Sequence, residues 1–213
     1  MATRIEEFLA PAIEGARMLL FEHPQNDSQI DSLLGQLGVI ALAEVETWLR
    51  RPVVLPAVGS YYVDRYLLGV RTSDPVRLRA TPVAAQGINK VELQVEDPAS
   101  GFEVLTEGSD WKLEGDSLYL PGLAGPSRFF GRERPVLRVT YRGGWNVSSD
   151  NIVIHSALVQ QITGLYNTRA YIGYSYAGGS KAVKVDLDTE CGLFRPVVAL
   201  LESLVYVGDG GPW

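Results

Sequence analysis

Apolar residues near the start of the chain recur at the spacing of a helix. In the strongest segment they lie three or four residues apart, at Ile30, Leu33, Leu34, Leu37, Ile40, Val45, Trp48 and Leu49. Ser28 can cap this helix, and Pro52 ends it because proline cannot donate to the helical hydrogen-bond ladder. A shorter stripe predicts a first helix over 11–22 with Pro11 in its first turn, and its apolar face is Ile13, Ala16, Leu19 and Leu20.

The pattern becomes strand-like from 53 to 142. Val91, Leu93 and Val95 alternate with polar residues at 92, 94 and 96, which predicts one buried face and one face in solvent. Gly, Pro, Asp and Asn separate this run from similar short runs before and after it. Many short strands separated by turn residues are typical of an antiparallel sandwich or a small barrel.

Helical spacing returns after Asp150. A helix is predicted to end near Gly173, with an apolar face made of Ile152, His155, Val159, Ile162, Leu165 and Tyr166. A last helix is predicted over 193–206, opened or interrupted by Pro196. Residues 170–190 between them are predicted to form a projecting hairpin with Gly178 and Gly179 at its tip.

These elements together predict an α+β fold. The N-terminal helix pair and the C-terminal helices are expected to form a small bundle, with a central antiparallel β sandwich or barrel-like insert. The predicted domains are a helical domain, 1–52 with 146–213, which carries the 170–190 hairpin, and an antiparallel β domain, 53–145.

Composition and charge narrow the class of protein. A chain of 213 residues, 46% hydrophobic and 21% charged, is an ordinary globular protein that can bury a core without disulfides. The net charge of −6 disfavours a protein that binds nucleic acid tightly, since such proteins need a basic face. Cys191 is the only cysteine, and Glu6 and Glu7 stand where a signal peptide would be apolar, so we expect synthesis in the cytoplasm.

The residues that could carry chemistry lack the spacing that chemistry needs. The chain has two histidines, His23 and His155, and Ser156 beside the second lacks the G-x-S-x-G elbow of a nucleophile. The run at 177–181 is not a phosphate-binding loop, because its lysine follows the serine instead of preceding it. We therefore expect no catalytic residue and no cofactor site.

An acidic group and a basic group are left without an assigned role. Asp186, Asp188 and Glu190 alternate, but a calcium loop would also need glycine and glutamate where Cys191 and Val197 stand, so no metal site is expected. These carboxylates fit a solvated or intersubunit face better. The basic group consists of five arginines, Arg128, Arg132, Arg134, Arg138 and Arg142. Three interpretations of them stay open: a solvated strand face, salt bridges to a neighbouring subunit, or transient phosphate contacts.

A set of local patterns in a fixed order resembles the head-tail adaptor (connector) proteins of tailed bacteriophages. The N-terminal helical pair closes on Glu46, Trp48 and Arg51, and SDWKLEGDSLYL resembles the family's strand-turn-strand. VTYRGGW resembles its strand end, and the next helix ends in the tyrosine-x-x-arginine of Tyr166 and Arg169. FRPVVALLESL resembles the closing helix. The likeness spans residues 11–206, although the family's proline before the third helix is missing here.

The resemblance implies a structural virion protein rather than an enzyme. Such adaptors form a homo-oligomeric ring, here expected to be dodecameric, that docks on the portal protein at the virion neck. The ring extends the channel for genomic double-stranded DNA and provides a platform for the next neck or tail protein. An acidic chain suits a channel wall, because negative walls repel phosphates and DNA passes without sequence-specific binding.

Two segments are the expected contact sites. The 170–190 hairpin is expected to reach a neighbouring subunit through Tyr171, Tyr174, Tyr176, Lys181 and Lys184. The end of the chain is expected to dock on the portal through Val205, Tyr206, Val207, Pro212 and Trp213. A disordered terminus is the competing interpretation of that tail.

Three other functions remain as alternatives. A tail-completion or stopper-type neck protein would be mainly β, which the two C-terminal helices disfavour. A carboxylate-dependent glycan hydrolase would need two close carboxylates in a cleft, and the sequence marks no such pair. A cytoplasmic binding module without any link to phages would show itself by its gene neighbourhood.

Overall fold

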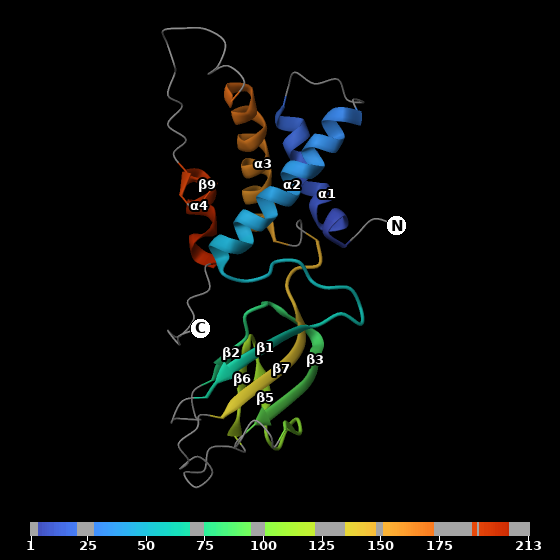
Figure 1. The fold of residues 1–213 in the computed structure, drawn as a ribbon, viewed down its shortest axis with the longest axis vertical. Coiled ribbons are helices and arrows are strands. Elements are labelled where there is room, and N and C mark those ends of the chain that lie inside the picture. The colour runs from blue at the N-terminus through green and yellow to red at the C-terminus, as the bar shows by residue number, and fades with distance from the viewer. Residues whose placement is uncertain are drawn as a thin grey trace. The chain divides into compact units, whose positions relative to one another are not determined.

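The computed structural model describes residues 4–20, 28–68, 75–94, 101–121, 135–147, 151–172, 189–190 and 192–204. Contacts divide the chain into two compact units (Figure 1). We call Met1–Arg50 with Asn146–Val205 the helical unit, and Arg51–Trp145 with Tyr206–Trp213 the β unit. Helices and antiparallel sheets are both present, so the predicted α+β class is confirmed.

Three long helices contact one another in the helical unit. They are α1 (Arg4–Leu19), α2 (Ser28–Leu49) and α3 (Ile152–Ile172), and each packs against the other two. The short helix α4 (Arg195–Leu201) packs on α3, beside which Figure 1 shows it. It continues into the 3₁₀ turn η5 (Glu202–Leu204). Strands β8 (Thr189–Glu190) and β9 (Leu193–Phe194) pair just before α4.

Helix α1 begins earlier than predicted. The sequence placed its start at Pro11, but the helix begins at Arg4 and holds Pro11 in its interior. A proline there removes one helical hydrogen bond, but the turn before it buries Phe8 and Leu9 completely, and this burial offsets the loss. The predicted face is also rotated, because Leu19 is exposed while Ala12 is buried.

The predicted bounds of α2 are confirmed, and its buried face is partly as predicted. Leu34, Val45 and Leu49 are buried, but Ile40 is 46% exposed. Gly38 faces the core, where a Cβ atom would lie 3.4 Å from side-chain atoms of Leu9 and Ile13 of α1. The small residue allows the two helices to approach closely.

Helix α3 ends at Ile172, as predicted, and its buried face is partly as predicted, because Ile162 and Tyr166 are buried. Asn151 caps its start, because the Oδ1 atom accepts hydrogen bonds from the backbone N–H groups of Val153 at 3.0 Å and Ile154 at 3.2 Å. Ile154 and Leu158 are fully buried, whereas the predicted core residue Ile152 is 77% exposed.

The predicted 170–190 hairpin is wrong at its first arm. Residues 170–172, including Tyr171, belong to α3, because nothing breaks the helical ladder before Gly173. The pairing that the structure does describe is short, with Thr189 opposite Phe194. The tip and the other predicted contact residues lie outside the described residues. The last helix is likewise shorter than predicted, with proline in its first turn.

Two antiparallel sheets make up the β unit. The four-stranded sheet has the order β1-β7-β3-β4 and the three-stranded sheet the order β2-β6-β5. The bounds of the strands are β1 (Tyr62–Leu67), β2 (Val76–Arg77), β3 (Val83–Gln94), β4 (Glu103–Val104), β5 (Lys112–Glu114), β6 (Ser117–Tyr119) and β7 (Val136–Gly143).

One apolar core joins the two sheets. Leu78 and Leu118 of the smaller sheet region and Leu137 and Val139 of β7 are fully buried in it. Tyr141 lies in the same core, where its hydroxyl accepts a hydrogen bond from the N–H of Ala80 at 2.8 Å and donates one to Asp64 at 2.6 Å. Two sheets that share one core form the expected sandwich.

Two glycines inside helices provide a matched pair of substitutions. A Cβ atom on Gly164 of α3 would lie 2.3 Å from the Phe194 ring, whereas one on Gly35 of α2 would have no neighbour within 4 Å. Both changes to alanine gain about 0.5–1 kcal/mol of helix propensity. In G164A, crowding of the ring outweighs that gain, at a typical cost of about 1–3 kcal/mol.

We therefore expect G35A to raise the urea midpoint of unfolding and G164A to lower it. The comparison isolates packing, because the gain in propensity is common to the two variants. Equal midpoints for the two proteins would show that Phe194 does not pack on α3 as described.

Candidate functional site

The described residues do not assemble a metal centre. Among them, no group of three or more His, Cys, Asp or Glu side chains could hold a metal ion. His155 lies on α3 beside Gly15 of α1, and its Nδ1 atom is buried with no hydrogen-bond partner among the described atoms. It is a half-buried packing residue. His23, Asp186 and Asp188 lie outside the described residues.

A buried amide links α2 and α3 to the short β8–β9 hairpin. Gln161 of α3 is fully buried, and its Nε2 atom donates to Glu44 Oε2 at 2.7 Å and to the carbonyl of Gly192 at 3.0 Å. Its Oε1 atom accepts from the N–H of Phe194 at 3.2 Å. Burial raises the pKa of Glu44, and the hydrogen bond from Gln161 opposes that change. This network positions the hairpin.

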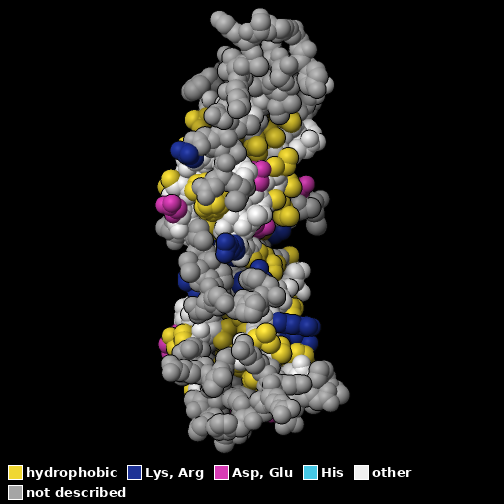
Figure 2. Space-filling view, turned by 60° about the vertical axis from the view of Figure 1, so that its left-hand side comes forward, with side chains coloured by type: hydrophobic (Ala, Val, Ile, Leu, Met, Phe, Trp, Pro, Cys, Tyr) yellow, Lys and Arg dark blue, Asp and Glu magenta, His cyan; other side chains and the backbone are white. Residues whose placement is uncertain are grey.

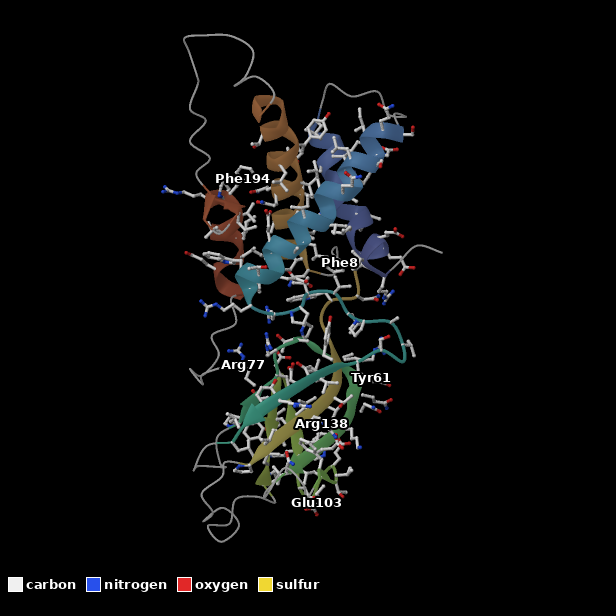
Figure 3. The ribbon with its side chains drawn as sticks, in the orientation of Figure 1. Phe8, Tyr61, Arg77, Glu103, Arg138 and Phe194 are labelled. Carbon is white, nitrogen blue, oxygen red and sulfur yellow. The ribbon has the colours of Figure 1, made fainter. Side chains whose placement is uncertain are left out.

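A cluster of ion pairs lies on the outward side of the four-stranded sheet. Glu92 of β3 accepts from Arg138 Nε at 2.7 Å and pairs with Lys90 Nζ at 2.7 Å. The guanidinium of Arg138 also stacks on Phe102, 4.0 Å from the ring centre, and Figure 3 shows Arg138 on this sheet. These groups leave Glu92 only 4% exposed, so the prediction that it faces solvent is wrong.

Two of the five arginines singled out in the sequence bind within their own chain. Arg138 pairs with Glu92, and Arg142 donates from Nη2 to the carbonyl of Pro56 at 2.9 Å. Neither is a simple solvated cation. The other three lie outside the described residues, so the three interpretations of that group stay open for them.

Another arginine is buried at the start of the β unit. Arg51 donates to the hydroxyl of Thr81, and its guanidinium lies 5.1 Å from the ring centre of Trp145. Burial lowers the pKa of Arg51. Because the β unit begins at Arg51 and the compact part of its chain closes at Trp145, this contact ties together the two ends of the unit.

The described residues of both units expose large apolar side chains. In the helical unit Ile5, Met18 and Leu19 of α1, Val39 and Ile40 of α2, and Ile152 are exposed. In the β unit the exposed apolar residues are Val58, Tyr61, Val63, Leu67 and Val104. Figure 2 shows hydrophobic side chains at the surface of both units. Single exposed apolar residues are common on proteins, but contiguous patches of them mark sites of contact with partners.

Sequence reasoning missed these surfaces. Ile40 was counted as part of a helical core, because hydrophobic residues surround much of α2 and periodicity alone could not choose its inner face. By length and composition alone α2 could also cross a membrane, a test that core helices of soluble proteins pass as well. The signal that was available is the lack of charged residues between Asp31 and Glu44.

The predicted contact residues cannot be placed, apart from Tyr171, whose backbone is helical. Tyr174, Tyr176, Lys181 and Lys184 lie outside the described residues, and so do Val205, Tyr206, Val207, Pro212 and Trp213. Their roles therefore stay predictions.

Comparisons with known proteins find likeness in structure alone. No protein-family model matches the chain, and no curated protein matches its sequence. A chain from the neck of an empty gene transfer agent (GTA) particle, computed with C6 symmetry, has a TM-score of 0.56 at 16% identity, covering 99% of this chain and 97% of that one. The chain shares its fold with a GTA neck chain. A second, from the virion of a native GTA particle, has a TM-score of 0.55 at 18% identity, covering 100% and 96% of the two chains.

The ion-pair cluster predicts a specific dependence of stability on pH. The hydrogen bond from Arg138, with a second from Lys90, lowers the pKa of Glu92 from 4.5 to about 2. A lowered pKa in the folded state stabilises the protein above pH 4.5, and this stability is lost as the pH falls toward 2. E92Q should therefore be less stable than the wild type at pH 6, and the two should converge as the pH approaches 2.

Urea midpoints at pH 6, 4 and 3 measure this effect. E114Q is the matched control, because Glu114 forms its ion pair with Lys112 in the open, with about half of each side chain exposed, and exposed pairs contribute little. An E92Q midpoint that runs parallel to the wild type over the whole range would contradict the assignment.

Proposed function

We propose that this protein is a structural subunit of a phage-type particle neck, and specifically a head-to-tail adaptor. In this proposal a dodecameric ring of copies docks on the portal protein, extends the DNA channel and provides a platform for the next neck or tail protein. The observation that supports it most is the likeness to a GTA neck chain over 99% of this chain and 97% of that one. A match over both units is stronger support than a match to one common module would be.

Two further observations agree with a structural role. The ordered sequence motifs resemble adaptor proteins, and this resemblance rests on the residues alone. Both units expose large apolar side chains, as a subunit that is buried in an assembly must do before it assembles. We propose no enzymatic activity, and the described residues contain no cluster that could hold a metal ion.

The parts of the chain receive separate roles in the proposal. The helical domain, 1–52 with 146–213, would build the ring, and the β domain, 53–145, would contribute to the platform for the next neck or tail protein. Lys181, Lys184 and the tyrosines near them would contact the next subunit, and the last nine residues, 205–213, would insert into the portal. With a net charge of −6 per copy, a ring of copies would repel the phosphates of passing DNA.

Native mass measurement with and without the cognate portal tests the proposal. We expect the protein to assemble into a ring on the portal and to remain bound to it. A persistent monomer that ignores the portal would contradict the adaptor function. Binding to a preformed adaptor ring instead of the portal would assign the protein to the stopper-type alternative.

The proposed docking tail has its own test. A protein that ends at Leu204 lacks the five proposed docking residues, so we expect it to fold normally and to lose portal binding by at least tenfold, about 1.4 kcal/mol. E202Q, a change at the exposed Glu202 just before the tail, should bind as the wild type does. Unchanged binding by the truncated protein would remove the tail from the interface.

A further inference from the structure

The outward side of α2 is free of charge along most of its length. From Ser32 to Thr47 the exposed positions of this helix are Ser32, Gln36, Val39, Ile40, Ala43 and Thr47. We call these six residues the α2 outer face. They span about 22 Å at the helical rise of 1.5 Å per residue. Val39 is 52% exposed and Ile40 is 46% exposed, so the centre of this face is apolar.

Helix α1 of the same unit has a charged outward side. The outward side of a surface helix normally carries charged residues. That of α1 does, with Glu7 paired to Arg4 and Glu14 paired to Arg17. The α2 outer face has no such pairs, and only 33% of the most apolar window of the helix is buried. The composition of α2 is typical of a helix that is buried on both sides, but the described residues bury only one side of it.

Gly35 supports the same conclusion. A glycine within a helix costs about 1 kcal/mol relative to alanine, so it usually has a reason in packing. Gly38 has one, because it lies against α1, but around Gly35 nothing in the described chain comes within 4 Å of a Cβ position. A close approach by another molecule would account for a glycine there.

The net charge of the chain indicates which kind of molecule can bind the α2 outer face. Each copy of the chain carries a net charge of −6, so copies repel one another wherever their charged faces meet. They can approach at low cost only through a surface without charge. The α2 outer face is such a surface, and the hydroxyl and amide groups of Ser32, Gln36 and Thr47 at its ends can still form hydrogen bonds. A basic partner or a DNA backbone would gain nothing from it.

A second apolar patch lies on the same unit. Met18 is 68% exposed and Leu19 beside it is also exposed, at the C-terminal end of α1. Because α1, α2 and α3 all pack on one another, the outward sides of α1 and α2 point in different directions. Two different patches on one packed unit are what a head-to-tail contact requires, and such contacts form a ring when the rotation from copy to copy closes on itself.

We propose that the α2 outer face binds the Met18–Leu19 end of α1 in a second copy of this chain. The contact is apolar at its centre, around Val39 and Ile40, and polar at its ends. This inference rests on the proposed function for the closure of the contact into a ring. The pairing of the two patches rests on the surface of the helical unit alone.

Cysteine cross-linking between separately labelled copies tests the pairing. Two proteins are made in a C191S background, one with I40C and the other with M18C, and they are mixed and assembled on the portal. A disulfide between the two proteins is the expected product. A product of I40C with itself would overturn the head-to-tail pairing, and so would the absence of any cross-link in rings that do form.

A charge placed on the face gives an independent readout. V39D and I40D introduce a carboxylate at exposed positions, so the proteins should fold, and each should reduce ring formation at least tenfold. I152D is the matched control, because Ile152 is 77% exposed on the same unit but lies outside both patches, and it should assemble normally. Normal assembly of V39D and I40D would overturn the inference. The inference would also be overturned if the wild type co-sedimented with phosphatidylcholine vesicles and I40D did not. That result would assign the α2 outer face to a membrane.

The same measurements separate the two proposals. If wild-type rings form on the portal, V39D and I40D assemble normally, and I40C forms no cross-link with M18C, this inference fails and the adaptor function stands. If the I40C and M18C proteins cross-link to each other when free in solution, but the portal is ignored, the contact stands and the adaptor function fails.

Discussion

Close approach of helices at glycine is the constraint on which the helical unit depends. Gly38 allows α2 to reach Leu9 and Ile13 of α1, and Gly15 of α1 lies where a Cβ atom would be 2.8 Å from Val159 of α3. A Cβ atom on Gly164 would lie 2.3 Å from Phe194, so at Gly15 and Gly164 a larger side chain would force the elements apart, whereas at Gly38 a Cβ atom would be in ordinary contact. This packing determines which side of each helix is buried, and therefore which side remains for partners.

Buried polar groups add specificity to this packing. The amide of Gln161 satisfies Glu44, Gly192 and Phe194 at once, so the β8–β9 hairpin has one position relative to α2 and α3. In the β unit Tyr141 does the same with Ala80 and Asp64. A half-satisfied network would be costly in a dry interior, and one that is satisfied fixes a single arrangement. Both units therefore present defined surfaces, as an assembly subunit needs.

The two units expose different kinds of surface. The exposed side of the four-stranded sheet combines Val63, Leu67 and Val104 with the Arg138–Glu92 ion pair, so it mixes apolar and charged groups. The α2 outer face has no charge at all. Mixed surfaces suit contacts that form and change during assembly, and uncharged ones suit permanent contacts between copies. The proposed ring and its platform correspond to this difference.

The sequence by itself determined the α+β class, the bounds of α2, the end of α3 and the buried alternation of Val91 and Leu93, because each depends on local periodicity or on a nearby helix-stopping residue. It could not choose the inner face of α2 or α3, since both helices are apolar on more than one side and the choice depends on which neighbours fit. It misplaced the start of α1, because burial of Phe8 outweighed the local cost of Pro11. It misjudged Glu92, whose cover comes from Arg138, 46 residues away in the chain. Only the tertiary structure decided these points, and with them which apolar residues are left at the surface.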